Sequence, residues 1–193
     1  MSGDGKSTFD AQAKSVLDTV LKANKEHIVS RWTEIVHGTY PFDTVGFLRT
    51  VKDRFSNPVG YRTEEAARAL MEAIFHEEPD QDALNAAVEE IIRVRAIQDF
   101  PPEAAVGIIF AIKDIIRDVA RRAAILAESA PALLQLESRI DAVALLAFGA
   151  YARSRETLYR LKVDEFKRQH SQLLRLAERK AAKISSDKAE THN

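Results

Sequence analysis

Two groups of residues in this chain have types that could do chemistry: the stretch GDGKST at Gly3–Thr8 and the histidines. Gly3–Thr8 is similar to the end of a phosphate-binding loop, in which backbone N–H groups and a lysine hold phosphate groups. The complete pattern requires another glycine before Gly5 and a strand that leads into the loop. Neither is seen in the sequence, so we interpret residues 1–7 as a disordered N-terminus and not as a nucleotide site.

The histidines could bind a metal ion or a haem. None of His27, His37, His76, His170 and His192 lies in an H-x-x-x-H or H-E-x-x-H arrangement, the spacings that place two ligands on one helix face. We therefore expect structural or surface roles for them, with no metal or cofactor site. Haem needs only one axial histidine, so binding of haem or a small ligand through His27, His37 or His76 stays an alternative.

Catalytic machinery is not indicated by the sequence. The carboxylates lie in helical charge patterns, such as Glu89 and Arg93, which are i, i+4 partners on a helix. No serine stands with a matched histidine in a nucleophile motif, and there is no glycine-rich catalytic turn. The absence of cysteine excludes disulfides, cysteine-ligated metals and thiol nucleophiles. We expect a protein that is not an enzyme.

The composition is typical of a globular helical domain. The 193 residues are 46% hydrophobic and 30% charged with only 7 glycines, which suits one domain rich in helix-forming residues. The longest apolar run, Ala104–Ile116, is interrupted by Lys113 and Asp114 and is too short to span a bilayer. The N-terminus is polar and does not resemble a signal peptide, so we expect a cytoplasmic location.

Charge is unevenly distributed along the chain. Residues 153–193 hold 11 basic and 6 acidic residues, whereas the rest of the chain holds 17 basic and 23 acidic residues. A basic segment could bind nucleic acid, but acidic residues are interspersed here and few aromatic residues are present to stack on bases. The mixture favours a solvated helix face, and no nucleic-acid partner is expected.

Apolar residues recur at helical spacing nearly throughout the chain, and no strand pattern is present, so the predicted fold class is all-α. We predict a single bundle of about six helices over residues 8–152. The expected helices cover 8–37 with a bend near Asn24, 43–55, 64–76, 81–98 with Asp80 as its N-cap, 102–128 and 132–183.

The stretch KDRFSNPVGY at Lys52–Tyr61 is the most motif-like part of the chain, and we interpret it as a corner between two helices. Pro58 disfavours helical geometry at Asn57 and Gly60 supplies backbone freedom. Thr63 is then expected to cap a helix that begins at Glu64. A structural turn is favoured over a contact surface for its residues, which are Asp53, Arg54, Phe55, Asn57, Pro58 and Gly60.

The last predicted helix is the longest, because residues 132–183 contain no proline and only one glycine. Its first half is apolar on most sides and should be buried, whereas residues 153–184 should project from the bundle, followed by a disordered tail over 185–193. In the projecting part, apolar residues recur at alternating steps of four and three, the spacing of a coiled coil. We predict that this seam forms a homodimer, with folding back onto the domain as the alternative. Its residues are Tyr159, Val163, Phe166, His170 and Leu173.

Three segments together carry a resemblance to a known family. They are KDRFSNPVGY, IIRVRAIQDFPPEAAVGIIFAIKDIIRD at Ile91–Asp118, and LESRIDAVALLAFGAYARSRETLYRLKVDEFKR at Leu136–Arg168. In this order, and over about Ile28 to Arg168, the chain resembles the RsbRD N-terminal domain family, named after the RsbT co-antagonist proteins of bacterial stress signalling.

The resemblance implies an all-helical, sensor-like input domain. Related co-antagonists carry a globin-like N-terminal domain that lacks haem, dimerise, and send a helix onward to a phosphorylatable STAS output domain, which this sequence does not contain. We therefore expect a regulatory module whose partner is a kinase or a STAS-type signalling protein. Similar stand-alone domains in anaerobic, sulfate-reducing bacteria raise the alternative of an accessory subunit or assembly factor of a respiratory redox complex.

Overall fold

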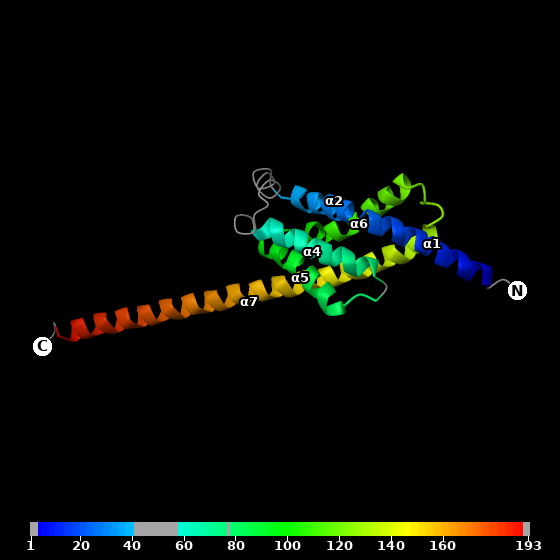
Figure 1. Ribbon diagram of the computed structural model, residues 1–193. Coiled ribbons are helices and arrows are strands. Elements are labelled where there is room, and N and C mark those ends of the chain that lie inside the picture. The colour runs from blue at the N-terminus through cyan, green and yellow to red at the C-terminus, as the bar shows by residue number, and fades with distance from the viewer. Residues whose placement is uncertain (1–3, 41–57, 77, 191–193) are drawn as a thin grey trace. The chain divides into compact units, whose positions relative to one another are not determined.

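The computed structural model describes residues 4–40, 58–76 and 78–190, and all secondary structure in these ranges is helical (Figure 1). The predicted all-α class and very long C-terminal helix are confirmed, while the implied globin-like character stays a prediction. The predicted helix 43–55 lies outside the described residues, and so do Asp53, Arg54, Phe55 and Asn57. The helices in the described ranges are α1 Asp4–Ala23, α2 Lys25–Gly38, α4 Pro58–Phe75, α5 Gln81–Ile97, α6 Pro102–Arg122 and α7 Ala130–Glu190.

The predicted first helix is two helices, because the chain breaks at Asn24. This residue has φ −108° and ψ 11°, and its side-chain Nδ2 donates a hydrogen bond to Val20 O at 2.8 Å. Asparagine side chains compete with the helix for backbone partners and therefore favour helix ends. The break falls where the bend was predicted, and α1 begins at Asp4, before the predicted start at Thr8.

The start of α4 corrects the prediction. This helix begins at Pro58 and not at Glu64, so Pro58 opens it and Thr63 is not its cap. Proline suits the first position of a helix, because the N–H that it lacks would have no partner there and its fixed φ is already helical. Gly60 is buried in the first turn. Proline can both end one helix and start the next, and the prediction used only the first property.

Helix α5 has a closing structure at each end. Asp80 is the predicted N-cap, and its carboxylate accepts hydrogen bonds from two backbone N–H groups of the first turn, at 3.0 and 3.1 Å. At the other end Asp99 has a φ of 61°, and the N–H of Phe100 donates to Arg95 O at 3.1 Å. This is the long bond of a Schellman turn, which brings the residue after the turn back onto the last turn of the helix.

Helix α6 ends earlier than predicted, at Arg122 and not near Glu128. Ala124 has a φ of 58°, and the N–H of Ile125 donates to Ala120 O at 3.0 Å. The same Schellman turn therefore closes α6. The sequence signal for such a turn is glycine, since its left-handed conformation is costly for other residues. An alanine at this position hides the helix end from sequence analysis.

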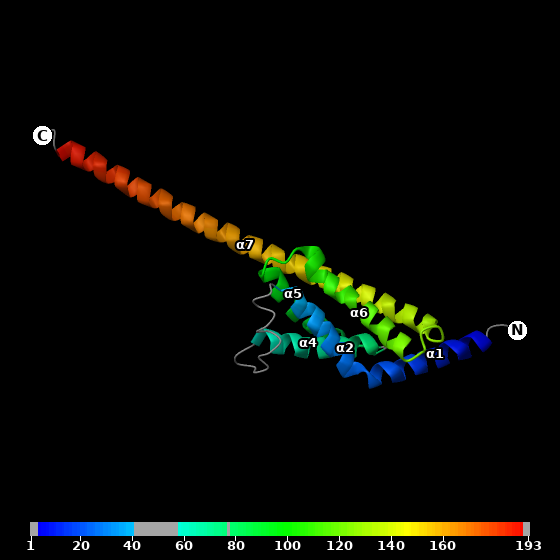
Figure 2. The same cartoon turned by 90° about the horizontal axis from the view of Figure 1, so that it is seen from above.

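The core joins α1, α2, α4, α5, α6 and the first part of α7 through buried aliphatic side chains. α2 contacts both α4 and α6, and α4 contacts α5. Trp32 of α2 is fully buried, and its Nε1 donates to Ile108 O of α6 at 2.7 Å, so the indole loses no hydrogen bond on burial. Figure 2 shows α6 running beside the first part of α7.

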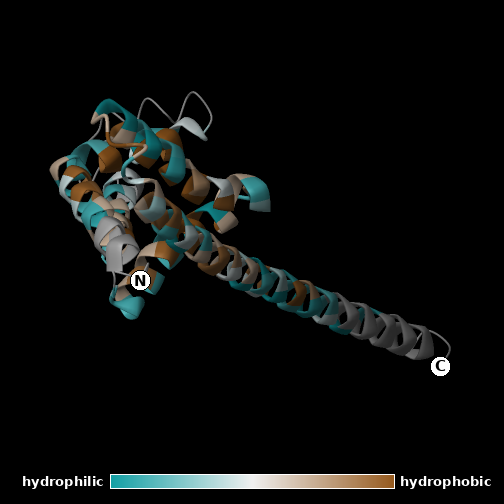
Figure 3. Ribbon diagram, turned by 90° about the vertical axis from the view of Figure 1, so that its right-hand side faces the viewer, coloured by the Kyte–Doolittle hydropathy of each residue, from teal (hydrophilic) through white to brown (hydrophobic). Residues whose placement is uncertain are grey.

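The contacts of the chain divide it into two compact units, residues 1–152 and residues 153–193, and α7 contributes to both. In the second unit every side chain from Tyr159 to Gln172 is exposed. Figure 3 shows hydrophobic residues interspersed among hydrophilic ones along this part of α7. Within the described ranges, no helix combines the length and the apolar content that crossing a bilayer requires.

Candidate functional site on helix α7

The part of α7 in the first unit is held by an apolar face. Buried residues recur at helical steps, which places them on one side of the helix. Burying one large aliphatic side chain is worth about 1.5–3 kcal/mol, so this face fixes residues 130–152 in the bundle. The residues are Leu133, Leu136, Ile140, Val143, Ala144, Ala147, Ala150 and Tyr151.

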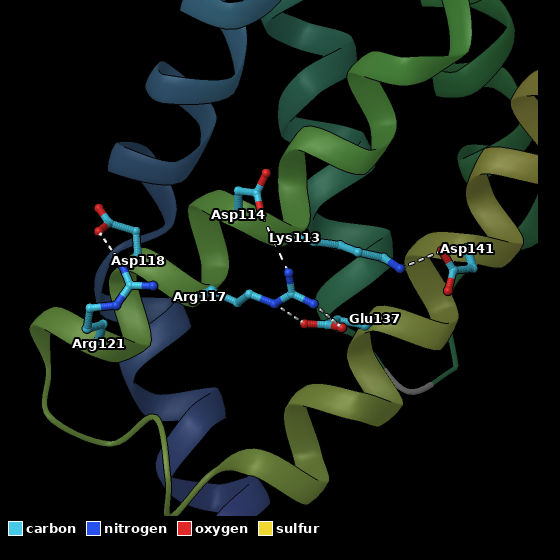
Figure 4. Close-up of polar contacts among 7 residues, drawn as sticks. All are labelled: Lys113, Asp114, Arg117, Asp118, Arg121, Glu137 and Asp141. Carbon is cyan, nitrogen blue, oxygen red and sulfur yellow. Dashed lines mark hydrogen bonds and ion pairs between the residues drawn. The ribbon is translucent and has the colours of Figure 1, made fainter. Parts of the chain in front are cut away.

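Ion pairs set the register of α7 on α6, as Figure 4 shows. Arg117 of α6 makes a two-pronged contact with Glu137 of α7, with Nε to Oε1 at 2.7 Å and Nη2 to Oε2 at 2.8 Å. One turn away, Lys113 Nζ donates to Asp141 Oδ1 at 2.6 Å. The hydrogen bonds to Glu137, and its charge, raise the pKa of Arg117. Two basic residues of α6, one turn apart, thus pair with two acidic residues of α7 that are also one turn apart, and the order of the pairs shows that the two helices are antiparallel.

The remaining charges of this surface pair within α6. Arg117 Nη1 also lies 3.5 Å from Asp114 Oδ1. Arg121 Nη1 lies 3.3 Å from Asp118 Oδ1, and Figure 4 shows this pair at the end of α6. Pairs at i, i+3 stabilise a helix weakly and do not hold a neighbour. Only Lys113 and Arg117 among the basic residues in the figure reach α7.

Two further side chains of α7, Arg139 and Tyr151, attach it to other parts of the first unit through three hydrogen bonds. Arg139 Nη1 donates to Ile74 O at 3.1 Å and to His76 O at 2.7 Å, which satisfies carbonyl groups at the end of α4. Tyr151 donates its hydroxyl proton to Phe100 O at 2.7 Å, in the turn after α5. The bond from Tyr151 to Phe100 lies at the boundary of the first unit, so α7 is connected to the bundle up to the end of that unit.

The residues predicted for the seam lie on the exposed part of α7. Tyr159, Val163 and Phe166 are 57%, 50% and 62% exposed. The ring of His170 stacks on Phe166 with centroids 5.0 Å apart, while Leu173 lies in α7 but its side chain is outside the described residues. The structure thus brings Phe166 and His170 together within one helix. Whether the seam binds a partner stays a prediction.

Sequence analysis missed several exposed hydrophobic residues of α7, among them Leu134 and Leu146. Leu145 and Phe148 belong to the half of the helix predicted to be buried on most sides, yet both are exposed, and so is Leu161 in the second unit. A helical projection could have identified Leu161, because it lies on the side of α7 away from Val163 and Phe166. Because the residues around Phe148 are mostly alanine, the hydrophobic pattern does not show which side of the helix faces the core.

Comparison with protein-family models gives one match, to the RsbT co-antagonist protein rsbRD N-terminal domain, over residues 26–165. The match covers most of the chain and includes α2, α4, α5, α6 and the bundle part of α7. The chain belongs to this family. No curated protein and no solved structure shows significant similarity to it.

Membership of the rsbRD N-terminal domain family indicates a regulatory, signalling-associated module. The family match ends at Glu165, so it contains Tyr159 and Val163 but not Phe166 and His170. The family resemblance inferred from sequence is therefore confirmed, and the outer part of the seam has to be judged from its own residues.

The histidines named as haem candidates do not share a site in this rsbRD-family chain. His37 is buried in α2, whereas His27 and His76 are exposed on α2 and after α4. His76 Nε2 lies 2.9 Å from Glu72 Oε1. No group of His, Cys, Asp and Glu side chains that could hold a metal is found in the described part of the chain.

Proposed function

We propose that this chain is a non-enzymatic regulatory module of sensory type that acts through protein–protein contacts, and that the exposed seam of α7 carries the contact. The supporting observation is the exposure of Tyr159, Val163 and Phe166 at steps of four and three along a continuous helix. A helix that exposes such a stripe is suited to pairing with a second helix. Large apolar side chains gathered on one exposed face mark interaction sites more often than scattered ones do.

The charges beside the seam define the kind of partner. In coiled coils the positions that flank the seam form ion pairs between helices and select the partner. Here these positions are Arg160, Lys162, Lys167 and Gln169, all of them exposed; three are basic and none is acidic. The acidic Asp164 and Glu165 lie away from the seam. A partner helix whose own seam is flanked by Asp and Glu would match this pattern.

A second copy of the chain, which the spacing alone predicts, fits the flanking charges less well. In a parallel pair Lys162 would face Lys167 of the other copy, and like charges in this arrangement repel. We therefore favour an acidic helix from a signalling partner, such as a kinase or a STAS-type protein, over a homodimer. The alternative of a respiratory accessory subunit stays a prediction.

The test uses two synthetic heptad peptides with the same apolar seam, one with Glu and one with Lys at the flanking positions. We expect the full chain to bind the Glu peptide, measured by fluorescence anisotropy, with an affinity that falls as salt rises. Phe166→Asp should abolish this binding. Leu161→Asp is the matched control, because Leu161 is 58% exposed on the same helix but off the seam, and it should bind as the unmodified chain does.

Two results would contradict the proposal. Equal binding of the Glu and Lys peptides would show that the flanking charges do not select the partner. Self-association of the chain in sedimentation experiments, lost in Phe166→Asp but not in Leu161→Asp, would instead support the homodimer.

A further inference from the structure

A cavity of about 420 Å³ lies beside α5 in the first unit. One wall is apolar and consists of Val36 of α2 and Ile91, Val94 and Ile97 of α5. Cavities that bind small molecules have volumes of this order, are lined largely by apolar groups, and add a few polar groups that fix the ligand. The apolar wall suits a short hydrocarbon group.

The polar lining of the cavity is positively charged. Arg62, Arg93 and Arg95 line it, and among the described lining residues Glu90 is the one carboxylate. Glu90 is shared by long contacts, with Oε1 3.3 Å from Arg62 Nη1 and Oε2 3.4 Å from Arg93 Nη2. Three guanidinium groups against one carboxylate leave an excess of positive charge, which favours an anionic ligand.

Arg95 is the most unusual of these groups, because it is a cation with only 1% exposure. It donates to Thr39 Oγ1 at 3.0 Å and to Ala104 O at 2.9 Å. In the described part of the chain no carboxylate forms an ion pair with it, and its Nε is buried without a hydrogen-bond partner. A buried charge without an ion-pair partner is unfavourable, so an anion in the cavity would relieve a cost that the fold carries.

Tyr40 provides a neutral donor at the same cavity. Burial raises the pKa of its phenol, and the nearby charge of Arg95 offsets this only in part. A protonated phenol can donate a hydrogen bond to an anion that also approaches guanidinium groups.

We propose that this cavity binds a small carboxylate with a short apolar body, its carboxylate directed to the arginines and its hydrocarbon part against Val36, Ile91 and Val94. This binding is a property of the first unit and does not depend on the seam of α7.

A route from the cavity to α7 is present within the first unit. The guanidinium of Arg95 lies 4.1 Å from the ring centroid of Phe100, and Phe100 O accepts the hydrogen bond of Tyr151 at 2.7 Å. A ligand that shifts Arg95 would therefore act on the residue that holds α7 at the boundary of the unit. A ligand influences α7 only if it binds two arrangements of this contact with different affinities. This part of the inference rests on the proposed function.

Isothermal titration calorimetry of the full chain with sodium hexanoate and with 1-hexanol tests the site. We expect a single site for hexanoate and an affinity for hexanol lower by roughly tenfold to a hundredfold, because the alcohol lacks the charge-assisted hydrogen bonds. Equal affinities for the two would overturn the proposal. Inorganic phosphate is titrated in parallel, and heat from phosphate with none from hexanoate would also overturn it.

The matched variants avoid the buried Arg95, whose loss could unfold the chain. Arg62→Gln/Arg93→Gln changes two exposed lining residues and should weaken hexanoate binding by roughly tenfold or more. Arg31→Gln/Arg121→Gln removes two comparably exposed arginines, each paired on its own helix. This control should leave the affinity for hexanoate unchanged. The same affinity in both double variants would place the anion elsewhere and overturn the proposal. Phe166→Asp should bind hexanoate normally, so failure of the seam and failure of the cavity are separate results.

Discussion

Helix α7 has two parts with similar apolar spacing and opposite surroundings. In residues 130–152 the apolar face is buried, and the acidic Glu137 and Asp141 beside it pair with basic residues of α6. In residues 159–170 the apolar face is exposed, and three of the four residues that flank it are basic. The first part shows what a satisfied face of this helix requires, namely an apolar neighbour and charges of opposite sign at its edges.

The bundle part of α7 indicates what kind of neighbour the exposed part would bind. Helix α6 supplies Lys113 and Arg117 to the acidic edge of the bundle part. On the basic edge of the exposed part, Arg160 pairs with Glu156 of its own helix, whereas no ion pair of Lys162 or Lys167 is found in the described residues, so this edge would suit an acidic neighbour. The proposed partner is therefore the counterpart of α6, with the sign of the charges reversed.

The largest expected difference between the two parts concerns stability. Ile140→Asp should destabilise the fold by at least about 3 kcal/mol, since it removes a fully buried aliphatic group and buries a polar one. Val163→Asp, the same kind of change on the exposed part, should stay within about 0.5 kcal/mol. Urea denaturation followed by circular dichroism measures both. Similar losses in the two variants would mean that the exposed part also packs in the folded chain.

A smaller effect separates two tyrosines of the same helix. Tyr151→Phe should cost about 1–2 kcal/mol, because Phe100 O loses its donor in a part-buried site. Tyr159→Phe should have almost no effect, since the Tyr159 hydroxyl accepts a hydrogen bond from Arg155 of its own helix in an exposed position. The measurement is the loss of unfolding free energy in each variant. Equal losses would show that the hydrogen bond from Tyr151 to Phe100 O does not stabilise the attachment of α7 to the turn after α5.

The sequence predicts the helical class and the long last helix because helical periodicity and the absence of proline are local signals. It also identifies the N-cap at Asp80 and the interruption at Asn24, where side-chain chemistry marks the position. It misplaces the end of α6, because the left-handed residue there is Ala124, and it misplaces the start of α4, because Pro58 can end or start a helix.

The candidate site was predictable only in part. The seam follows from spacing, since Tyr159, Val163 and Phe166 lie close together in sequence. The cavity does not, because it combines residues of three separate helices with Tyr40, and no motif links Arg95 to Thr39 or Phe100 before the chain is folded. The pairing of Arg117 with Glu137 depends in the same way on how α6 and α7 pack.

The ion pairs between α6 and α7 should contribute more to stability than the ion pairs within the exposed part of α7. Glu137→Arg should lower the melting temperature, because it places Arg117 opposite a like charge. Adding Arg117→Glu should restore most of the loss by re-forming the pair with exchanged signs. In the exposed part, Glu156→Arg opposes Arg160 within one helix and should change the melting temperature much less. Differential scanning calorimetry would detect the pattern, and a double variant no better than the single one would contradict it.

The smallest expected effect depends on pH and again separates the bundle from the exposed part. Lys25 of α2 donates a hydrogen bond to Glu72 of α4, which together with His76 lowers the pKa of Glu72 from its ordinary value of 4.5. A lowered folded-state pKa adds stability that is fully present at neutral pH and is lost as the pH falls through the folded-state value. Because Glu72 is half exposed, the contribution should stay below about 1 kcal/mol.

Glu72→Gln should therefore reduce stability slightly at pH 7 and by progressively less below about pH 4.5, where the unmodified chain loses the same contribution. Glu156→Gln, whose partner Arg160 lies on the same exposed helix, should leave the unfolding free energy unchanged at both pH values. Denaturant titrations of both variants and the unmodified chain at pH 7 and pH 3.5 make this comparison. A constant deficit for Glu72→Gln at both pH values would assign its effect to packing and not to the ion pair.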